Sequence, residues 1–180
     1  MPKQHEDEVL RRTSFKVLSC VSTVAFGLVA VGLLVSLTHD LEGGPTSGVA
    51  ACLFTIALVR RLLGSRIVLD SSAVEIVNPL VTYRVPYSSV AEIRGGGGGT
   101  LNLVTRAGDE IYSTGFGGSL IDNFVGSTGR AAERIEQRVR RGRRVTQQGS
   151  VTKKFTVSWI ADFCTAGAII CAVTAGVLGV

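Results

Sequence analysis

The residue types that most often carry enzymatic chemistry are sparse in the polar part of this chain. Its 180 residues include a 91-residue polar block, Gly64–Lys154, that contains no cysteine and no histidine. The aspartates and glutamates of the block are scattered, without the paired placement that general acid–base catalysis requires. The sequence therefore predicts a protein that is not an enzyme.

Metal and cofactor chemistry is not indicated either. The four cysteines all lie in apolar segments and none forms a C-x-x-C pair: Cys20, Cys52, Cys164 and Cys171. Cysteines placed in this way behave as small apolar residues, and neither a disulfide frame nor a zinc site follows. His5 and His39 are far apart in the sequence. We expect no metal and no cofactor.

A run of basic residues is the strongest functional signal. Near a membrane, each basic residue adds about 1 kcal/mol of attraction to anionic lipids. The alternative is a solvated helix face that only sets topology, and the two interpretations are compatible. Nucleic-acid binding is not expected, because aromatic residues do not interleave the run and no docking motif is evident. The predicted lipid-contact residues are Arg138, Arg140, Arg141, Arg143, Arg144, Lys153 and Lys154.

Five consecutive glycines, Gly95–Gly99, could suggest a phosphate-binding loop. A P-loop needs a lysine after its last glycine and a helix after that lysine. Here Thr100 follows, and the next residues alternate as in a strand. The run therefore predicts a hairpin loop.

Three apolar runs predict three membrane spans: Val17–Leu37, roughly Thr46–Leu63, and Phe155–Val180. The first has 21 residues without charge, enough to cross a hydrocarbon core of about 30 Å. It is too long for a cleaved signal peptide and no small-residue cleavage site follows it. A lipoprotein box at Cys20 is disfavoured, because the apolar region follows that cysteine.

The third run carries one acid and a stripe of small residues. Asp162 suits helix anchoring or a partner contact; the alternative is a proton or ion pathway, which would make the protein a small transporter or ion-coupled subunit. Small residues four apart let helices approach closely, within the chain or between copies as a homo-oligomer. They are Ala168, Ala172 and Gly176, with Gly167, Cys171, Ala175 and Gly179 beside them.

Charge asymmetry predicts the orientation. From Arg60 to Lys154 there are 15 basic and 8 acidic residues, whereas Thr38–Pro45 holds two acids and no basic residue. The positive-inside rule places the N-terminus and the polar block in the cytoplasm and the C-terminus outside a plasma membrane. The predicted domains are residues 1–16 (cytoplasmic segment), 17–63 (two-helix hairpin), 64–144 (cytoplasmic domain), 145–154 (basic tether) and 155–180 (third transmembrane helix).

Within the polar block, short alternating segments predict six antiparallel strands. A helix over about Arg130–Arg141 follows, with Ala131, Ala132, Ile135 and Val139 as its apolar stripe and Gly142 at its end. Leu120–Val125 suggests a short helical turn. The strand segments are Arg66–Asp70, Ala73–Pro79, Val81–Pro86, Tyr87–Arg94, Thr100–Arg106 and Asp109–Thr114.

The segment Tyr83–Ile93 resembles the V-P-W/Y-x-x-V-x-x-I stretch of bacterial PH-like domains, particularly the actinobacterial type named for low-molecular-weight protein antigen 6. Ile67–Asn78 is similar to the strand pair that precedes it, and two neighbouring transmembrane helices also match. Tyr87, where tryptophan is common, the five glycines and the third span depart from the pattern. The motif positions are Val85, Pro86, Tyr87, Val90 and Ile93.

The resemblance, over roughly Ser65–Thr114, implies an α+β protein: transmembrane helices plus a PH-like antiparallel β-sandwich or partly open barrel capped by a C-terminal helix. It also implies a binding or scaffold module with a protein partner and no catalytic residues. Phosphoinositide specificity is not carried over, because the early strands hold only Arg84 and Arg94 as single, separated basic residues. We expect a multi-pass membrane protein whose cytoplasmic module contacts anionic lipid and a protein partner.

Overall fold

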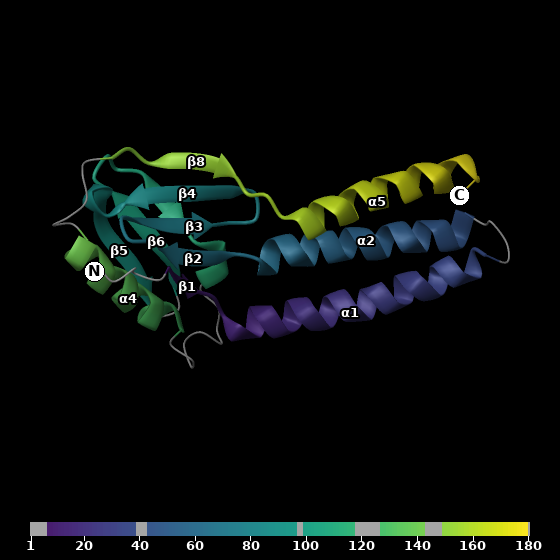
Figure 1. Ribbon diagram of the computed structural model, residues 1–180, viewed down its shortest axis with the longest axis horizontal. Coiled ribbons are helices and arrows are strands. Elements are labelled where there is room, and N and C mark those ends of the chain that lie inside the picture. Colours follow the sequence, from purple (N-terminus) through teal and green to yellow (C-terminus); the bar gives the residue numbers. More distant parts are fainter. Residues whose placement is uncertain (1–6, 39–42, 97–98, 118–126, 143–148, 180) are drawn as a thin grey trace, which may run out of the picture. The chain divides into compact units, whose positions relative to one another are not determined.

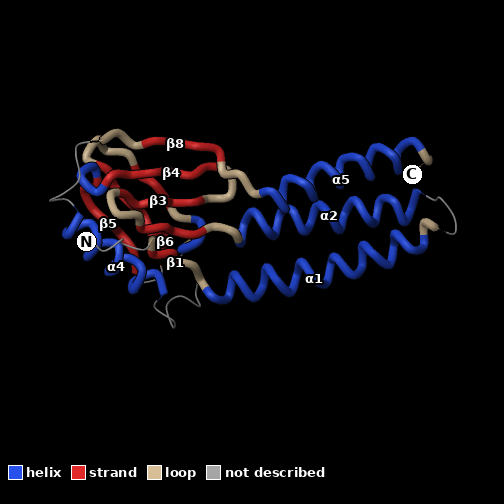
Figure 2. Tube along the Cα trace, in the orientation of Figure 1, coloured by secondary structure: helices blue, strands red, loops and turns tan. Residues whose placement is uncertain are grey.

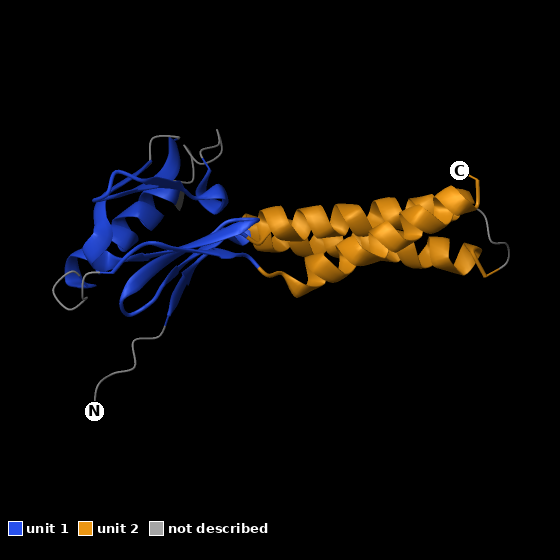
Figure 3. Cartoon of the chain, turned by 90° about the horizontal axis from the view of Figure 1, so that it is seen from above, with its two compact units in different colours: residues 1–13, 65–156 blue, residues 14–64, 157–180 orange. Residues whose placement is uncertain are grey.

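The computed structural model describes residues 7–38, 43–96, 99–117, 127–142 and 149–179. The chain forms two compact units, coloured separately in Figure 3. Unit 1 comprises residues 1–13 and 65–156, and unit 2 comprises residues 14–64 and 157–180. The α+β class is confirmed, because unit 1 holds two antiparallel sheets and a helix and unit 2 holds long apolar helices.

The first sheet of unit 1 has five antiparallel strands in the order β1-β2-β3-β4-β8 (Figure 1). A turn at Asp70–Ser72 joins β2 to β3, and the Ser71 amide donates to Asp70 Oδ1 at 2.5 Å. Strands β2 to β4 form where the sequence predicts them. The strands are β1 (Glu8–Leu10), β2 (Arg66–Leu69), β3 (Ala73–Val77), β4 (Val81–Pro86) and β8 (Thr152–Phe155).

Both edge strands of this sheet differ from the sequence prediction. β1 comes from the predicted N-terminal segment and pairs Glu8 with Leu69. β8 comes from the predicted tether and pairs Lys153 with Tyr83. At three and four residues, these strands are too short to produce a readable periodicity. The third long helix accordingly begins at Trp159 and not at Phe155, because Phe155 is taken up by the ladder with β4.

The second sheet is a meander of β5 (Val90–Gly96), β6 (Gly99–Thr105) and β7 (Glu110–Tyr112). The predicted hairpin at the glycine run is confirmed, because Gly96 pairs with Gly99. A turn at Ala107-Gly108 joins β6 to β7, and Gly108 has φ of 90°, which glycine adopts without strain. The predicted strand from Tyr87 starts only at Val90, because Tyr87–Ser89 forms a 3-10 turn, η1. A second 3-10 turn, η2, spans Thr114–Phe116.

Helix α4 (Ser127–Gly142) confirms the predicted amphipathic helix. Its Ala131, Ile135 and Val139 are buried at three- to four-residue spacing, as the apolar stripe predicts. They pack into a single core with side chains from both sheets, including Ile67, Leu69, Val74, Ile76, Val85, Tyr87, Val90, Leu101, Leu103, Ile111 and Phe116. The predicted turn at Leu120–Val125 lies outside the described residues.

Unit 2 contains α1 (Thr13–Ser36, whose first residue belongs to unit 1), α2 (Gly43–Leu63) and α5 (Trp159–Val177), shown as blue helices in Figure 2. All three are long and apolar enough to cross a membrane, so the chain is a candidate multi-span membrane protein. Small residues set the packing distances: a Cβ at Gly48 of α2 would lie 2.8 Å from Leu33 of α1, and one at Gly167 of α5 would lie 3.1 Å from Leu53. Ala161, Ala168 and Ala175 form the buried stripe of α5.

Candidate functional site

A groove lies between β5 and α4 of unit 1. β5 contributes Val90–Ile93, and α4 contributes Glu136, Val139 and Arg140. Its volume is about 240 Å³, whereas pockets for drug-sized ligands usually start near 300 Å³. The groove therefore suits one or two side chains of a larger partner better than a free small molecule.

The accessible lining of the groove is mainly polar, because its apolar members Val90 and Val139 are only 1% and 2% exposed. On the rim, Arg140 donates to Glu136 at 2.7 Å, and outside it Arg94 donates to Glu92 at 2.7 Å. The hydrogen bond from Arg94 lowers the pKa of Glu92. Exposed pairs of this kind contribute roughly 0–1 kcal/mol, so their charges can be redirected to a partner at little cost.

Glycine lets α4 approach β5 closely enough to form this groove. A Cβ at Gly95 would lie 3.3 Å from Ala132 Cβ and 3.4 Å from Thr128 Cγ2. The sequence predicts the glycine run only as a loop and does not reveal the groove. The sequence signal for the groove is a small residue, Ala132, in the apolar stripe of the helix, together with a glycine, Gly95, in the strand that it faces.

The five predicted lipid-contact cations that the structure describes do not lie together. Arg138 is partly buried, and Arg140 and Arg141 are exposed in the last turn of α4. Lys153 and Lys154 lie on β8, where the Lys153 ammonium stands 5.5 Å from the centre of the Tyr83 ring. Arg143 and Arg144 lie outside the described residues.

The five motif positions serve the core. Val85, Pro86, Tyr87 and Val90 run from the end of β4 into β5; apart from partly buried Pro86 they are buried, and Ile93 packs against them. The Tyr87 hydroxyl donates to the Asp70 carbonyl at 2.6 Å. Burial raises the pKa of Tyr87 to about 12, although the nearby Arg138 guanidinium opposes this.

A charge network crosses the outer face of the first sheet. Arg84 donates to Glu75 and to Asp70, at 2.5 Å in each case. Burial alone would raise the pKa of Asp70, but hydrogen bonds from Ser71 and Arg84 outweigh it, and the pKa lies below its ordinary value. The arrangement ties the β2–β3 turn, β3 and β4 together.

Asp162 lies in the first turn of α5, where its carboxylate forms an ion pair with Arg61 at the end of α2. Its second oxygen accepts from the amide of the N-cap residue Ser158 at 3.2 Å, which satisfies a backbone donor at the start of α5. The Arg61 side chain is 19% exposed and that of Asp162 is 37% exposed. The sequence analysis identified Asp162 but not its partner, because the two residues are 101 positions apart. This pairing favours anchoring of α5 to α2 over an ion pathway.

Among the residues that the structure describes, no three His, Cys, Asp or Glu side chains gather as metal ligands. The four cysteines are free thiols. In comparisons with known proteins, no family model, no curated protein and no solved structure matches this chain.

Proposed function

We propose that this protein is a multi-span membrane protein that displays unit 1 as a PH-like binding module, without catalysis. The observation that carries the proposal is the order of its elements: two antiparallel sheets followed by a helix whose apolar stripe enters their common core. The Val85-Pro86-Tyr87 stretch at the end of β4 supports the PH-like assignment. Asp70, Glu75 and Glu92 are held in ion pairs with arginines. Acids held in this way are poor general acids or bases, which supports a binding role over a catalytic one.

The module and the N-terminus share the cytoplasmic side in this proposal. Pairing of β1 with β2 supports it, because α1 and α2 lie between these strands in sequence and a two-helix hairpin returns the chain to its starting side. The basic excess of residues 60–154 then selects the cytoplasm of a plasma membrane, and the single crossing of α5 leads the C-terminus outside.

Two kinds of partner fit the module. The β5–α4 groove fits side chains of a protein partner, because its volume suits one or two side chains and its lining carries both charges. Lys153 and Lys154 fit anionic lipid, because Trp159 and the membrane-length α5 follow within six residues. Arg140 lines the groove, so we assign it to the protein partner.

The protein-partner part is tested by photo-cross-linking of the full chain in native membranes. A photoreactive side chain at Ala91, in the groove, should capture a discrete protein that the same side chain at Asp109, in the exposed β6–β7 turn, does not. Arg140→Glu should weaken capture, whereas Arg141→Glu, with the same charge change on the same helix, should not. Equal capture at both positions, or equal loss in both variants, would contradict the proposal.

The lipid part is tested by hydrogen exchange of the full chain in nanodiscs. Phosphatidylserine should slow exchange around β8 relative to neutral lipid, and the double change Lys153→Ser with Lys154→Ser should remove the difference. Arg140→Ser with Arg141→Ser removes the same charge and should leave the difference intact. If lipid charge has no effect, or if the second pair matters as much as the first, the lipid assignment is wrong.

A further inference from the structure

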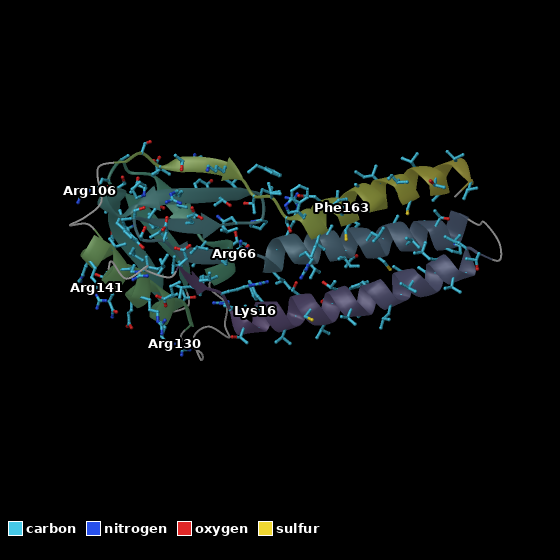
Figure 4. The ribbon with its side chains drawn as sticks, viewed as in Figure 1. Lys16, Arg66, Arg106, Arg130, Arg141 and Phe163 are labelled. Atoms are coloured by element: carbon cyan, nitrogen blue, oxygen red, sulfur yellow. The ribbon has the colours of Figure 1, made fainter. Side chains whose placement is uncertain are left out.

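The three connections of unit 1 to the long helices leave from one end of its first sheet. Leu10 pairs with Ile67, Arg66 pairs with Val77, and Phe155 pairs with Val81. These pairs bring the start of α1, the end of α2 and the approach to α5 to the same strand ends. We call this the exit end. Figure 4 shows Arg66 there, with Arg106 and Arg141 at the opposite end of unit 1.

Exposed apolar side chains concentrate at the exit end. Among the described residues of unit 1, the large hydrophobic side chains that stay exposed are Leu80, Tyr112 and Phe155, at 58%, 55% and 64%, and Val9 on edge strand β1. The first three belong to neighbouring segments, because the Thr156 amide donates to the Leu80 carbonyl and the Asn78 side chain donates to the Tyr112 carbonyl. Lys154, which precedes Phe155 in β8, adds a cation to this end of the sheet.

Covalent continuity sets how far this surface can be from the bilayer. Phe155 precedes Trp159 by four residues, which span at most about 14 Å when extended. Trp159 is 73% exposed in the first turn of a membrane-length helix, the position at which tryptophan marks the membrane–water interface. Arg66 likewise follows the last residue of α2 by three positions. The exit end is therefore held next to the lipid headgroups.

We propose that the exit end docks into the interfacial layer of the bilayer, with Leu80, Tyr112 and Phe155 among the headgroups and Lys154 at the phosphates. Aromatic and aliphatic side chains beside a lysine are the composition that this layer favours. The docking rests on the three helices being embedded in a membrane and does not depend on what the groove binds. It holds unit 1 in a fixed orientation.

The orientation has a consequence for the rest of unit 1. Helix α4 starts at the exit end, where Arg12 donates to Thr128, and ends at the opposite end, where Gly142 lies against Tyr87. Docking through the exit end therefore presents Arg140, Arg141 and the β5–α4 groove to the aqueous phase. Docking through the last turn of α4 would instead lift Leu80 and Phe155 into water.

The test measures membrane depth with nitroxide spin labels on the full chain in phosphatidylcholine–phosphatidylserine nanodiscs, in a background where the four native cysteines are replaced by alanine. Labels at Leu80→Cys and Phe155→Cys probe the exit end. If replacing Phe155 in strand β8 disturbs the fold, the label at Leu80 still reports, because Leu80 lies in a turn. Labels at Arg106→Cys and Arg141→Cys are exposed controls from the opposite end. Power saturation compares relaxation by oxygen, which partitions into lipid, with relaxation by a water-soluble nickel chelate.

We expect the exit-end labels to be several-fold less accessible to nickel than the controls while remaining accessible to oxygen. Nickel accessibility equal to that of Arg106→Cys would overturn the proposal, because the exit end would then lie in water. Protection from both reagents would also overturn it, because a protein surface and not lipid would cover these residues. Loss of groove cross-linking leaves this result unchanged, so the two proposals fail independently.

Discussion

Gly142→Ala should destabilise unit 1, although alanine is the better helix former. A Cβ at position 142 would lie 2.9 Å from both Cγ and Cε2 of Tyr87 and closer still to Cδ2. The ring cannot yield easily, because Tyr87 is 1% exposed and its hydroxyl is held by the Asp70 carbonyl. Overpacking of this kind costs about 1–3 kcal/mol, against a propensity gain of about 1 kcal/mol at most. Because the contact with Cδ2 is far inside van der Waals distance, the upper part of that range, about 2–3 kcal/mol, applies, and we expect a net loss of roughly 1–2 kcal/mol.

Gly129→Ala is the matched control. It lies in the same helix, and a Cβ there would meet no atom within 4 Å, so we expect no loss and a gain of up to about 1 kcal/mol. Hydrogen exchange of the β3 and β4 amides in the full detergent-solubilised chain reports on unit 1 alone. A loss of 1–2 kcal/mol corresponds to exchange about 5- to 30-fold faster.

A double-mutant cycle separates the clash from other causes. Tyr87→Leu alone should cost stability through a cavity, but it also opens space beside Gly142. The double variant, Tyr87→Leu with Gly142→Ala, should therefore lose less stability than the sum of the two single losses. Strict additivity, or a Gly142→Ala variant as protected as the parent chain, would refute the reasoning.

Three further predictions concern charge. Because its pKa in the fold is about 12 against an ordinary value of 10.0, Tyr87 contributes stability that is fully present below pH 10 and is lost as pH rises towards 12, by about 2–3 kcal/mol; Tyr87→Phe should flatten this limb in alkaline unfolding followed by near-ultraviolet circular dichroism. The lowered pKa of Asp70 contributes stability that is present above its ordinary value of 3.8 and is lost as pH falls below it. Protection from hydrogen exchange should therefore fall between pH 5 and pH 3, and it should fall less in Asp70→Asn than in the parent chain. Asp162→Asn and Arg61→Gln should each reduce the thermal stability of the helical unit, and the double variant should be less damaged than the sum, whereas additive losses would deny the ion pair any role.

Where the residues carry a strong periodicity, the fold was predictable. β3 and β4 alternate clearly enough to be located within two residues, and the Ala131–Ile135–Val139 stripe located α4. Periodicity does not reveal β1 and β8, because each forms a strand only by pairing with a strand more than 50 residues away in the sequence. Their hydrogen bonds are a property of the assembled sheet and not of the local sequence.

The site was less predictable than the fold, because it depends on which faces meet. The groove needs Gly95 opposite Ala132, and neither residue has chemistry that draws attention in a sequence. Asp162 was recognisable as an unusual charge, but Arg61 could be named as its partner only once α2 and α5 were packed together. Single residues of unusual type can be found from sequence, whereas pairs and surfaces require the tertiary contacts.

The basic run shows why adjacency in sequence misleads about surfaces. Arg141 and Lys153 are twelve positions apart, which suggests one cluster, yet they lie on two elements, α4 and β8, that run in opposite directions. Gly142 lies against Tyr87 at the far end of β4, and the Gly149 carbonyl accepts from Ser89 in the same region, so β8 starts at that end and runs back towards the exit end. At about 3.3 Å per residue, its four residues carry Lys154 and Phe155 away from the α4 arginines towards the helices. One charge run thus supplies two surfaces at opposite ends of unit 1, and a variant series that neutralises the whole run at once could not tell a lipid contact from a protein contact.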